Sequence, residues 1–248
     1  MWQPIVVGVL LALVFVGAVA VGLKQRHSPP PARFQSRSPT ALLCFRSLCL
    51  AFYLVVLVAQ WIKSGFAAYN FYTFWNFNLQ AVYFAWTLLA CVVGSVNSRG
   101  LNTLFDVVFA NSFVVAAVFW GVLYSPKYGV TWLQVAQHGV NSVLLLLEFA
   151  LNDFSVQPRS LIYASFLLPD VFAAFAWVAR ECWLDYWVYS FLNVYKGASP
   201  LWYVGMLLGH CVFFGLAIGL SKLKQSVRRD ATELTSPLVR ESISVQKV

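Results

Sequence analysis

The chain has 248 residues, of which 60% are hydrophobic, 17% aromatic and only 10% charged. So little polar surface cannot coat a water-soluble globule of this size, which excludes a soluble domain and makes the bilayer the solvent. Backbone polar groups must find partners internally in a bilayer, and the long apolar runs lack the alternation of barrel strands. We therefore expect an all-α, polytopic integral membrane protein.

Seven apolar segments are long enough, at about 20 residues each, to span a hydrocarbon core about 30 Å thick. In chain order they are 3–23, 41–62, 73–93, 102–124, 132–151, 160–179 and 201–221. The predicted organisation is an N-terminal transmembrane anchor over 1–23, a basic Pro-rich cytosolic linker over 24–40, a six-helix membrane domain over 41–221 and a cytosolic tail over 222–248. We expect the tail to become disordered towards its end, because it is charged and rich in Ser and Thr.

The distribution of basic residues predicts the orientation of these segments. Of the 17 Lys and Arg residues, all but four lie in or next to the linker, the alternate loops and the tail. The exceptions are Lys63, Lys127, Arg180 and Lys196. Because basic loops are retained in the cytosol, we expect the C-terminus there and the N-terminus on the opposite side. The net charge of +8 then favours anionic lipid headgroups at the cytosolic face as partners, and not nucleic acid. Endoplasmic reticulum and plasma membrane both fit.

A polar stripe runs along the segment 73–93. Thr73, Asn76 and Gln80 are spaced by three and four residues, which places them on one face of a helix. Polar groups at membrane depth are costly, so this stripe should face protein or water, and each member is a candidate for function. The alternative is hydrogen bonding between packed helices, which Asn and Gln commonly supply in membranes.

The segment 132–151 carries His138, with Asn141 on the same helix face. A single histidine within a membrane is more often a hydrogen-bonded packing element than a catalytic group. Topology favours the catalytic interpretation, since this segment and 73–93 both begin at the predicted non-cytosolic side. We therefore expect Thr73 and His138 in the same leaflet, where a nucleophile can meet its base.

A second polar cluster is expected near the cytosolic side. Glu148 lies near the end of one segment, and Asn102 and Asp106 lie at the start of another. Ion pairing with Arg99 or Arg159 is favoured here over a proton pathway.

Several other chemistries lack their motifs. The chain has no clustered histidine boxes, no Gly-rich phosphate loop and no Gly-x-Ser-x-Gly elbow. Its 3 histidines are dispersed, and most of its 5 cysteines fall in apolar runs without metal-ligand spacing. We expect no metal, no cofactor and no disulfide.

Short motifs along the chain resemble one known family. They are FYTF at 71–74, LQAVYF at 79–84, VFWGVLY at 118–124, His138-Gly139 followed by Glu148, and YWVYSFL at 186–192. In this order they resemble, over residues 44–220, the androgen-induced and androgen-dependent membrane protein family of atypical threonine hydrolases. The resemblance implies a six-helix hydrolase with both ends cytosolic that cleaves fatty acid esters of hydroxy fatty acids. Segment 3–23 and the linker look like additions, and Ser190 stands where the family usually has proline.

The family's membrane-embedded threonine and histidine match Thr73 and His138. The hypothesis is that Thr73 attacks a lipid ester while His138 takes its proton. Candidate donors to the oxyanion are Asn76, Gln80 and Asn141. The one acidic residue we consider for orienting His138 is Asp185, in an outer loop. The alternative function is a transporter or lipid-binding scaffold with a polar cavity lined by 73–93 and 132–151.

Overall fold

The computed structural model describes residues 2–25, 39–93, 98–152 and 154–245. This described part of the chain is 88% helical and contains no strand. Six of its helical spans are long and apolar enough to cross a membrane, namely Gln3–Gln25, Thr40–Asn70, Tyr72–Val93, Arg99–Leu123, Pro158–Cys182 and Ser199–Arg228. The prediction of an all-α, polytopic membrane protein is therefore confirmed. Most of the predicted linker lies outside the described residues.

All elements of the described residues are helical. The α-helices are α1 (Gln3–Gln25), α2 (Pro39–Ser64), α3 (Tyr72–Val93), α4 (Ser98–Val118), α5 (Trp132–Val135), α6 (Asn141–Leu151), α7 (Leu168–Cys182) and α8 (Ser199–Val245). Short 3₁₀ segments are η1 (Gly65–Asn70), η3 (Pro126–Tyr128), η5 (Pro158–Ser160) and η7 (Ser190–Leu192). The π-helical segments are η2 (Phe119–Leu123), η4 (Ala136–Val140) and η6 (Ile162–Leu167).

The predicted span 132–151 is helical from end to end, but it consists of α5, the π-helical η4 and α6. It is not apolar enough over its length to count as a membrane-crossing helix, so the described residues contain six such helices and not the seven predicted. Its hydropathy is lowered by polar side chains, which are Gln134, Gln137, His138, Asn141 and Glu148. A π-helical turn inside an α-helix is often found at a functional site, and this one contains His138.

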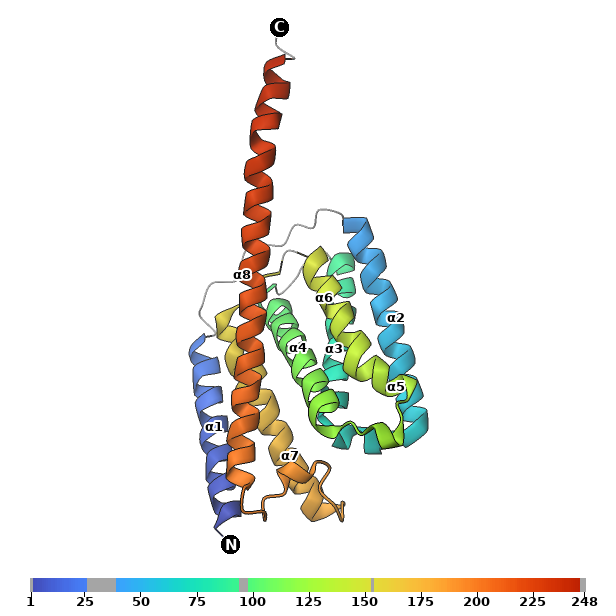
Figure 1. Cartoon of the computed structure of the whole chain (residues 1–248), viewed down its shortest axis with the longest axis vertical. Helices are drawn as coiled ribbons and strands as arrows, with labels where there is room; N and C mark the ends of the chain where they lie inside the picture. Colours follow the sequence, from blue (N-terminus) through green and yellow to red (C-terminus); the bar gives the residue numbers. More distant parts are fainter. Residues whose placement is uncertain (1, 26–38, 94–97, 153, 246–248) are drawn as a thin grey trace.

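Two buried clusters of apolar side chains hold the bundle together. The larger lies between α2, α3, α4 and α6 and is rich in aromatic rings such as Tyr53, Phe77 and Phe105. The smaller joins α1, α7, the segment around η7 and the start of α8, and it includes Val7 and Leu11 of α1. Helices α4 and α8 contact each other and connect the two halves (Figure 1). Helix α1 is thus packed into the bundle against α7 and α8, although the sequence presents it as a separate anchor.

The outward faces of the helices are apolar. Ile62 and Val92, for example, are 77% and 85% exposed. A water-soluble protein rarely presents so many large apolar side chains together, whereas lipid solvates them without cost.

Helix α8 continues to Val245, through the segment that the sequence predicts to become disordered. Its continuation is attached to the end of α6 by two basic residues. Lys224 donates to the carbonyl groups of Phe149 and Phe154, and Arg228 donates to that of Ala150 (3.2 Å). The last carbonyls of a helix have no partner within it, so these cations cap α6 and are favoured by its dipole.

Candidate active site

Thr73 and His138 are in direct contact. Thr73 is the second residue of α3, and its Oγ1 lies 3.1 Å from Nε2 of His138, which belongs to η4, 65 residues further along the chain. The imidazole is only 8% exposed, and Thr73 is partly buried. The structure therefore brings together the two side chains that the sequence suggests as nucleophile and base.

The other nitrogen of His138 fixes the orientation of the ring. Nδ1 lies 2.9 Å from the backbone carbonyl oxygen of Gln134, one turn earlier. A carbonyl can only accept a hydrogen bond, so in the neutral ring Nδ1 carries the proton and Nε2 presents its lone pair to the Thr73 hydroxyl. A backbone carbonyl, and not the carboxylate of Asp185, thus occupies the orienting position.

A second π-helical segment, η2, holds His138 from the other side. The Phe119 ring stacks on the imidazole with centroids 3.8 Å apart and planes inclined by 15°. The neighbouring Trp120 donates its indole N–H to the carbonyl oxygen of His138 at 2.8 Å. These contacts leave the imidazole little freedom to turn away from Thr73.

Tyr189 lies beside Thr73. In the sequence it is marked only as part of the motif at 186–192. Its hydroxyl accepts a hydrogen bond at 3.2 Å from the backbone N–H of Tyr72, the residue before Thr73, and Tyr189 and Thr73 line both of the cavities described below. Burial raises the pKa of Tyr189 to about 12, so this hydroxyl keeps its proton near neutral pH. Tyr189 can therefore donate a hydrogen bond next to the Thr73 hydroxyl.

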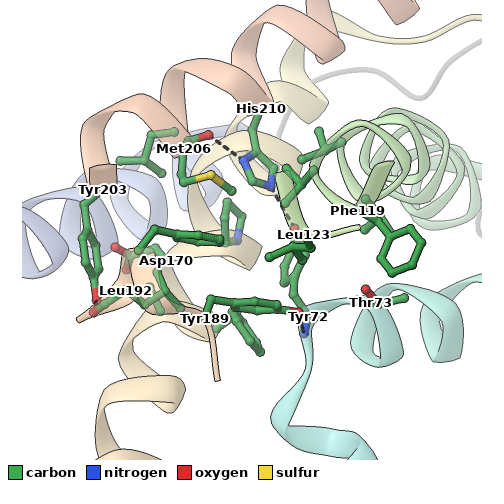
Figure 2. Close-up of a pocket in the computed structure, with 18 of the residues that line it drawn as sticks. Tyr72, Thr73, Phe119, Leu123, Asp170, Tyr189, Leu192, Tyr203, Met206 and His210 are labelled. Carbon is green, nitrogen blue, oxygen red and sulfur yellow. Dashed lines mark hydrogen bonds between the residues drawn. The ribbon is translucent and has the colours of Figure 1, made fainter. Parts of the chain in front are cut away.

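Two cavities of different character meet at Thr73. The first has a volume of about 70 Å³ and is lined mainly by apolar side chains of α1, α4, α7, α8 and the segment around η7. Figure 2 shows Thr73 and Phe119 at one end of it and Leu192 and Tyr203 at the other. The second cavity, of about 330 Å³, is lined by more polar groups from α2, α5 and η4 and also includes His138. The residues that line both are Thr73, Phe119, Leu123 and Tyr189.

The apolar cavity contains a few deeply buried polar groups. His210 repeats the geometry of His138, with Nδ1 2.7 Å from the carbonyl oxygen of Met206 and Nε2 3.2 Å from the hydroxyl of Tyr72 (Figure 2). Asp170, only 2% exposed, lines the same cavity. The sequence leaves the role of His210 open and misses Asp170, although an acidic residue inside an apolar span is itself an indication of function.

The three candidate oxyanion donors lie on the helices of the Thr73–His138 pair but on neither cavity wall. Asn76 is one helical turn from Thr73, Asn141 is one turn from His138, and both are 1% exposed. Asn141 Nδ2 donates to Oε1 of Gln80 at 3.4 Å and so links α6 to α3. Neither cavity is lined by any of the three. For Gln80 and Asn141, the observed contact is the helix-to-helix hydrogen bonding that the sequence gives as the alternative, whereas the buried amide of Asn76 has no hydrogen-bond partner among the described residues.

Glu148 has a different partner from those predicted. Its Oε1 accepts from Nη2 of Arg46 (2.6 Å), Nε of Arg46 (3.0 Å), the Tyr83 hydroxyl (2.7 Å) and Nδ2 of Asn152 (3.0 Å). Arg46 is on α2, and the pair is nearly closed to solvent, with the side chains 11% and 0% exposed. A buried carboxylate with this many donors is a structural crosslink between α2, α3 and α6.

Among the described residues, Asp106 shares no hydrogen bond with Glu148 and forms a separate cluster, which lies within electrostatic reach of Arg159, one of the two predicted partners. Its carboxylate accepts from Nδ2 of Asn102 (2.9 Å), the Ser160 hydroxyl (2.6 Å) and the Gln157 backbone N–H (3.1 Å). These bonds tie the start of α4 to η5 and satisfy a fully buried acid.

Among the described residues, no group of three or more His, Cys, Asp or Glu side chains could hold a metal ion. Comparison of the chain with protein-family models, with curated proteins and with solved structures finds no match. Fold and site together define a multi-pass, all-α membrane protein with a hydroxyl–imidazole pair between two cavities.

Proposed function

We propose that this protein is a membrane-embedded lipid ester hydrolase in which Thr73 is the nucleophile and His138 the general base. The observation that carries the proposal is the 3.1 Å contact between Thr73 Oγ1 and Nε2 of His138. Nδ1 of the same ring is hydrogen-bonded to the backbone carbonyl of Gln134, which leaves Nε2 free to accept a proton. A threonine hydroxyl is scarcely ionised near neutral pH and becomes a useful nucleophile only beside such a base. The resemblance to threonine hydrolases supports the same assignment.

The chemistry proceeds in two halves. Thr73 Oγ1 attacks the ester carbonyl carbon while its proton passes to Nε2 of His138, which then returns the proton to the departing alcohol oxygen. The product of this half is an acyl-threonine and a free alcohol. His138 next takes a proton from water, whose oxygen attacks the acyl group, and the acid leaves as Thr73 regains its proton.

Tyr189 is the donor best placed for the oxyanion, because it lines both cavities beside Thr73, whereas Asn76, Gln80 and Asn141 line neither. The first-turn N–H groups of α3 add the positive end of a helix dipole at the same place. We expect Tyr189→Phe to lower kcat by about 10²-fold with a small change in KM, since an oxyanion donor acts mainly in the transition state. Steady-state kinetics on a lipid ester measures this, and an unchanged kcat would remove Tyr189 from the mechanism.

The two cavities support a lipid ester as substrate. An apolar cavity suits an acyl chain, and the larger, more polar cavity suits the alcohol half. The family resemblance points to fatty acid esters of hydroxy fatty acids. We further propose that the C-terminus is cytosolic, with anionic headgroups against the basic linker and tail, in the endoplasmic reticulum or plasma membrane.

Labelling with a serine- and threonine-reactive fluorophosphonate tests the proposal. We expect the purified wild type to be labelled at Thr73, and Thr73→Ala and His138→Ala not to be labelled, because only a hydroxyl activated by a base attacks the phosphorus. Thr87→Ala is the matched control, since Thr87 is a buried threonine of the same helix as Thr73 whose hydroxyl donates to the carbonyl oxygen of Phe84 and which lines neither cavity. Mass spectrometry locates the adduct, and thermal unfolding verifies that each variant is folded.

Failure of the folded wild type to label, or an adduct elsewhere than Thr73, would contradict the hydrolase proposal. The transporter or lipid-binding scaffold would then be preferred, and substrate-dependent transport in reconstituted vesicles would separate those two.

A further inference from the structure

The apolar cavity contains a carboxylic acid that the proposed reaction does not use. Asp170 belongs to the first turn of α7, lines this cavity and is 2% exposed. Its Oδ1 is buried and has no hydrogen-bond partner among the described residues. An acid within a membrane span is costly, and a buried polar atom without a partner adds to that cost. Asp170 therefore needs an explanation beyond packing.

The other polar side chains of this cavity are already engaged. Both ring nitrogens of His210 have partners, which are a backbone carbonyl and the hydroxyl of Tyr72. The hydroxyl of Tyr203 donates to a backbone carbonyl oxygen at 2.9 Å. The hydroxyls of Thr73 and Tyr189 belong to the catalytic end, and none of the described residues that line the cavity is lysine or arginine. The acid is thus the lining group that is left to meet a ligand.

The helix dipole does not account for this acid. An acidic residue in the first turn of a helix is usually stabilised by the free N–H groups there. The π-helical η6 continues directly into α7, however, and the N–H of Leu168 is bonded to the carbonyl of Tyr163. Asp170 therefore lies inside one continuous apolar span, Pro158–Cys182, and not at a free helix end.

Asp170 is distant from the reacting pair. Figure 2 shows it near Leu192, at the end of the cavity away from Thr73. Most of the remaining lining side chains are aliphatic or aromatic. A ligand that extends from Thr73 to Asp170 must therefore be apolar along most of its length and carry a hydrogen-bonding group at the far end.

We propose that Asp170 binds a hydroxyl group on the acyl half of the substrate, so that the site selects esters of hydroxylated acyl chains. This inference rests on the proposed hydrolase function. The esters that the family resemblance implies have a plain acyl half, and their hydroxy acid is the alcohol half, so the resemblance does not imply this subsite. A hydroxyl both donates and accepts, and it therefore satisfies the acid whether the carboxyl group is ionised or protonated.

A hydroxyl is favoured over an ammonium group as the donor. A ligand that arrives through hydrocarbon brings a hydroxyl into an apolar cavity at much lower cost than a full charge. Asp170 takes no part in bond breaking: the acyl group is transferred to Thr73 and leaves as a hydroxy acid, with its hydroxyl on Asp170 throughout. Asp170 is therefore a specificity-determining residue.

Steady-state kinetics of the full chain in lipid vesicles tests the inference. The substrates are umbelliferyl esters of a saturated long-chain fatty acid and of its monohydroxylated derivatives, which differ only in the carbon that carries the hydroxyl. We expect wild type to hydrolyse one positional isomer with kcat/KM about 10-fold or more above that of the plain ester, as for a hydrogen bond to a charged group. Equal hydrolysis of the plain ester and every isomer would overturn the proposal.

Two substitutions of Asp170 assign this preference to its carboxyl group. Asp170→Leu should abolish the preference and hydrolyse the plain ester at least as well as wild type, because the cavity becomes apolar at both ends. Asp170→Asn keeps the shape and an amide that still donates and accepts, so it should retain part of the preference. A preference that is unchanged in folded Asp170→Leu would refute the assignment.

The control is Glu181→Gln, which alters an exposed acid of the same helix that lines neither cavity and should leave the preference unchanged. An isomer with an ammonium group in place of the preferred hydroxyl separates the two donors. It should be a poorer substrate for wild type than the hydroxylated ester. If it is the better substrate and Asp170→Leu loses that advantage, the assignment to a hydroxyl is wrong.

Labelling by a plain alkyl fluorophosphonate reports on Thr73 and His138 without the hydroxyl subsite. If wild type and Asp170→Leu label alike while no hydroxylated ester is preferred, the subsite is refuted and the hydrolase stands. If folded wild type does not label, the proposed function fails and this inference fails with it.

Discussion

We expect Thr73→Ala and His138→Ala each to lower the rate of ester hydrolysis by at least about 10³-fold, and the double variant to be no slower than the slower single variant. The two side chains act as one unit across the 3.1 Å contact, so removal of either leaves the other without a function. The residual rate would come from binding and from donors to the oxyanion. The measurement is kcat/KM for a long-chain ester in vesicles, with wild type and the three variants at equal amounts of folded protein.

Thr73→Ser is the matched control for this result. Serine retains the hydroxyl and loses only a methyl group, so hydrolysis and labelling should persist, with kcat within about 10-fold of wild type. Independent, additive losses in Thr73→Ala and His138→Ala would show that the two residues do not act together, and the catalytic assignment would have to be withdrawn.

We expect Glu148→Leu to be the most destabilising single substitution of the polar interior, with a loss of about 3–5 kcal/mol in the free energy of unfolding. The substitution removes the acceptor of Arg46, Tyr83 and Asn152 and leaves the guanidinium of Arg46, 11% exposed, without its carboxylate. An uncompensated cation inside a membrane bundle is far more costly than the loss of the pair as a whole. Thermal or denaturant unfolding in detergent micelles measures the change.

The double variant Arg46→Met/Glu148→Leu separates these two effects. Because both charges are removed together, it should be clearly more stable than Glu148→Leu alone, by at least about 1 kcal/mol. If the double variant were less stable than either single variant, Arg46 and Glu148 would stabilise the bundle independently, and the cost of Glu148→Leu would not come from an unpaired charge.

The sequence predicts the spans well because a membrane-crossing helix must be long and apolar, and this is a local property. Thr73 and His138 could be suggested as partners from topology alone, since both follow loops on the same side. Hydropathy does not report which face of a helix meets which neighbour. For this reason the sequence predicts the wrong partner for Glu148, because Arg46 is 102 residues away along the chain and its contact depends on how α2 is rotated.

Other features of the site depend on backbone detail that residue patterns do not encode. The π-helical turns at η2 and η4 shift the registers of Phe119 and His138 and bring their rings together. Tyr189 reaches Thr73 from a connection between two spans, where neither periodicity nor polarity distinguishes it from neighbouring aromatic residues. The orienting group of His138 is a carbonyl, which every residue possesses and no motif reveals.

Helix α1 supplies Leu11 to the wall of the apolar cavity, although the family resemblance begins only after this helix. Leu11 would then limit the length of an acyl chain bound in that cavity, although it belongs to a segment outside the resemblance. Two proteins with the same threonine and histidine, one with such a helix and one without, would then differ in the chain lengths they accept. Selectivity of that kind could evolve at the edge of the bundle without any change in the reacting groups.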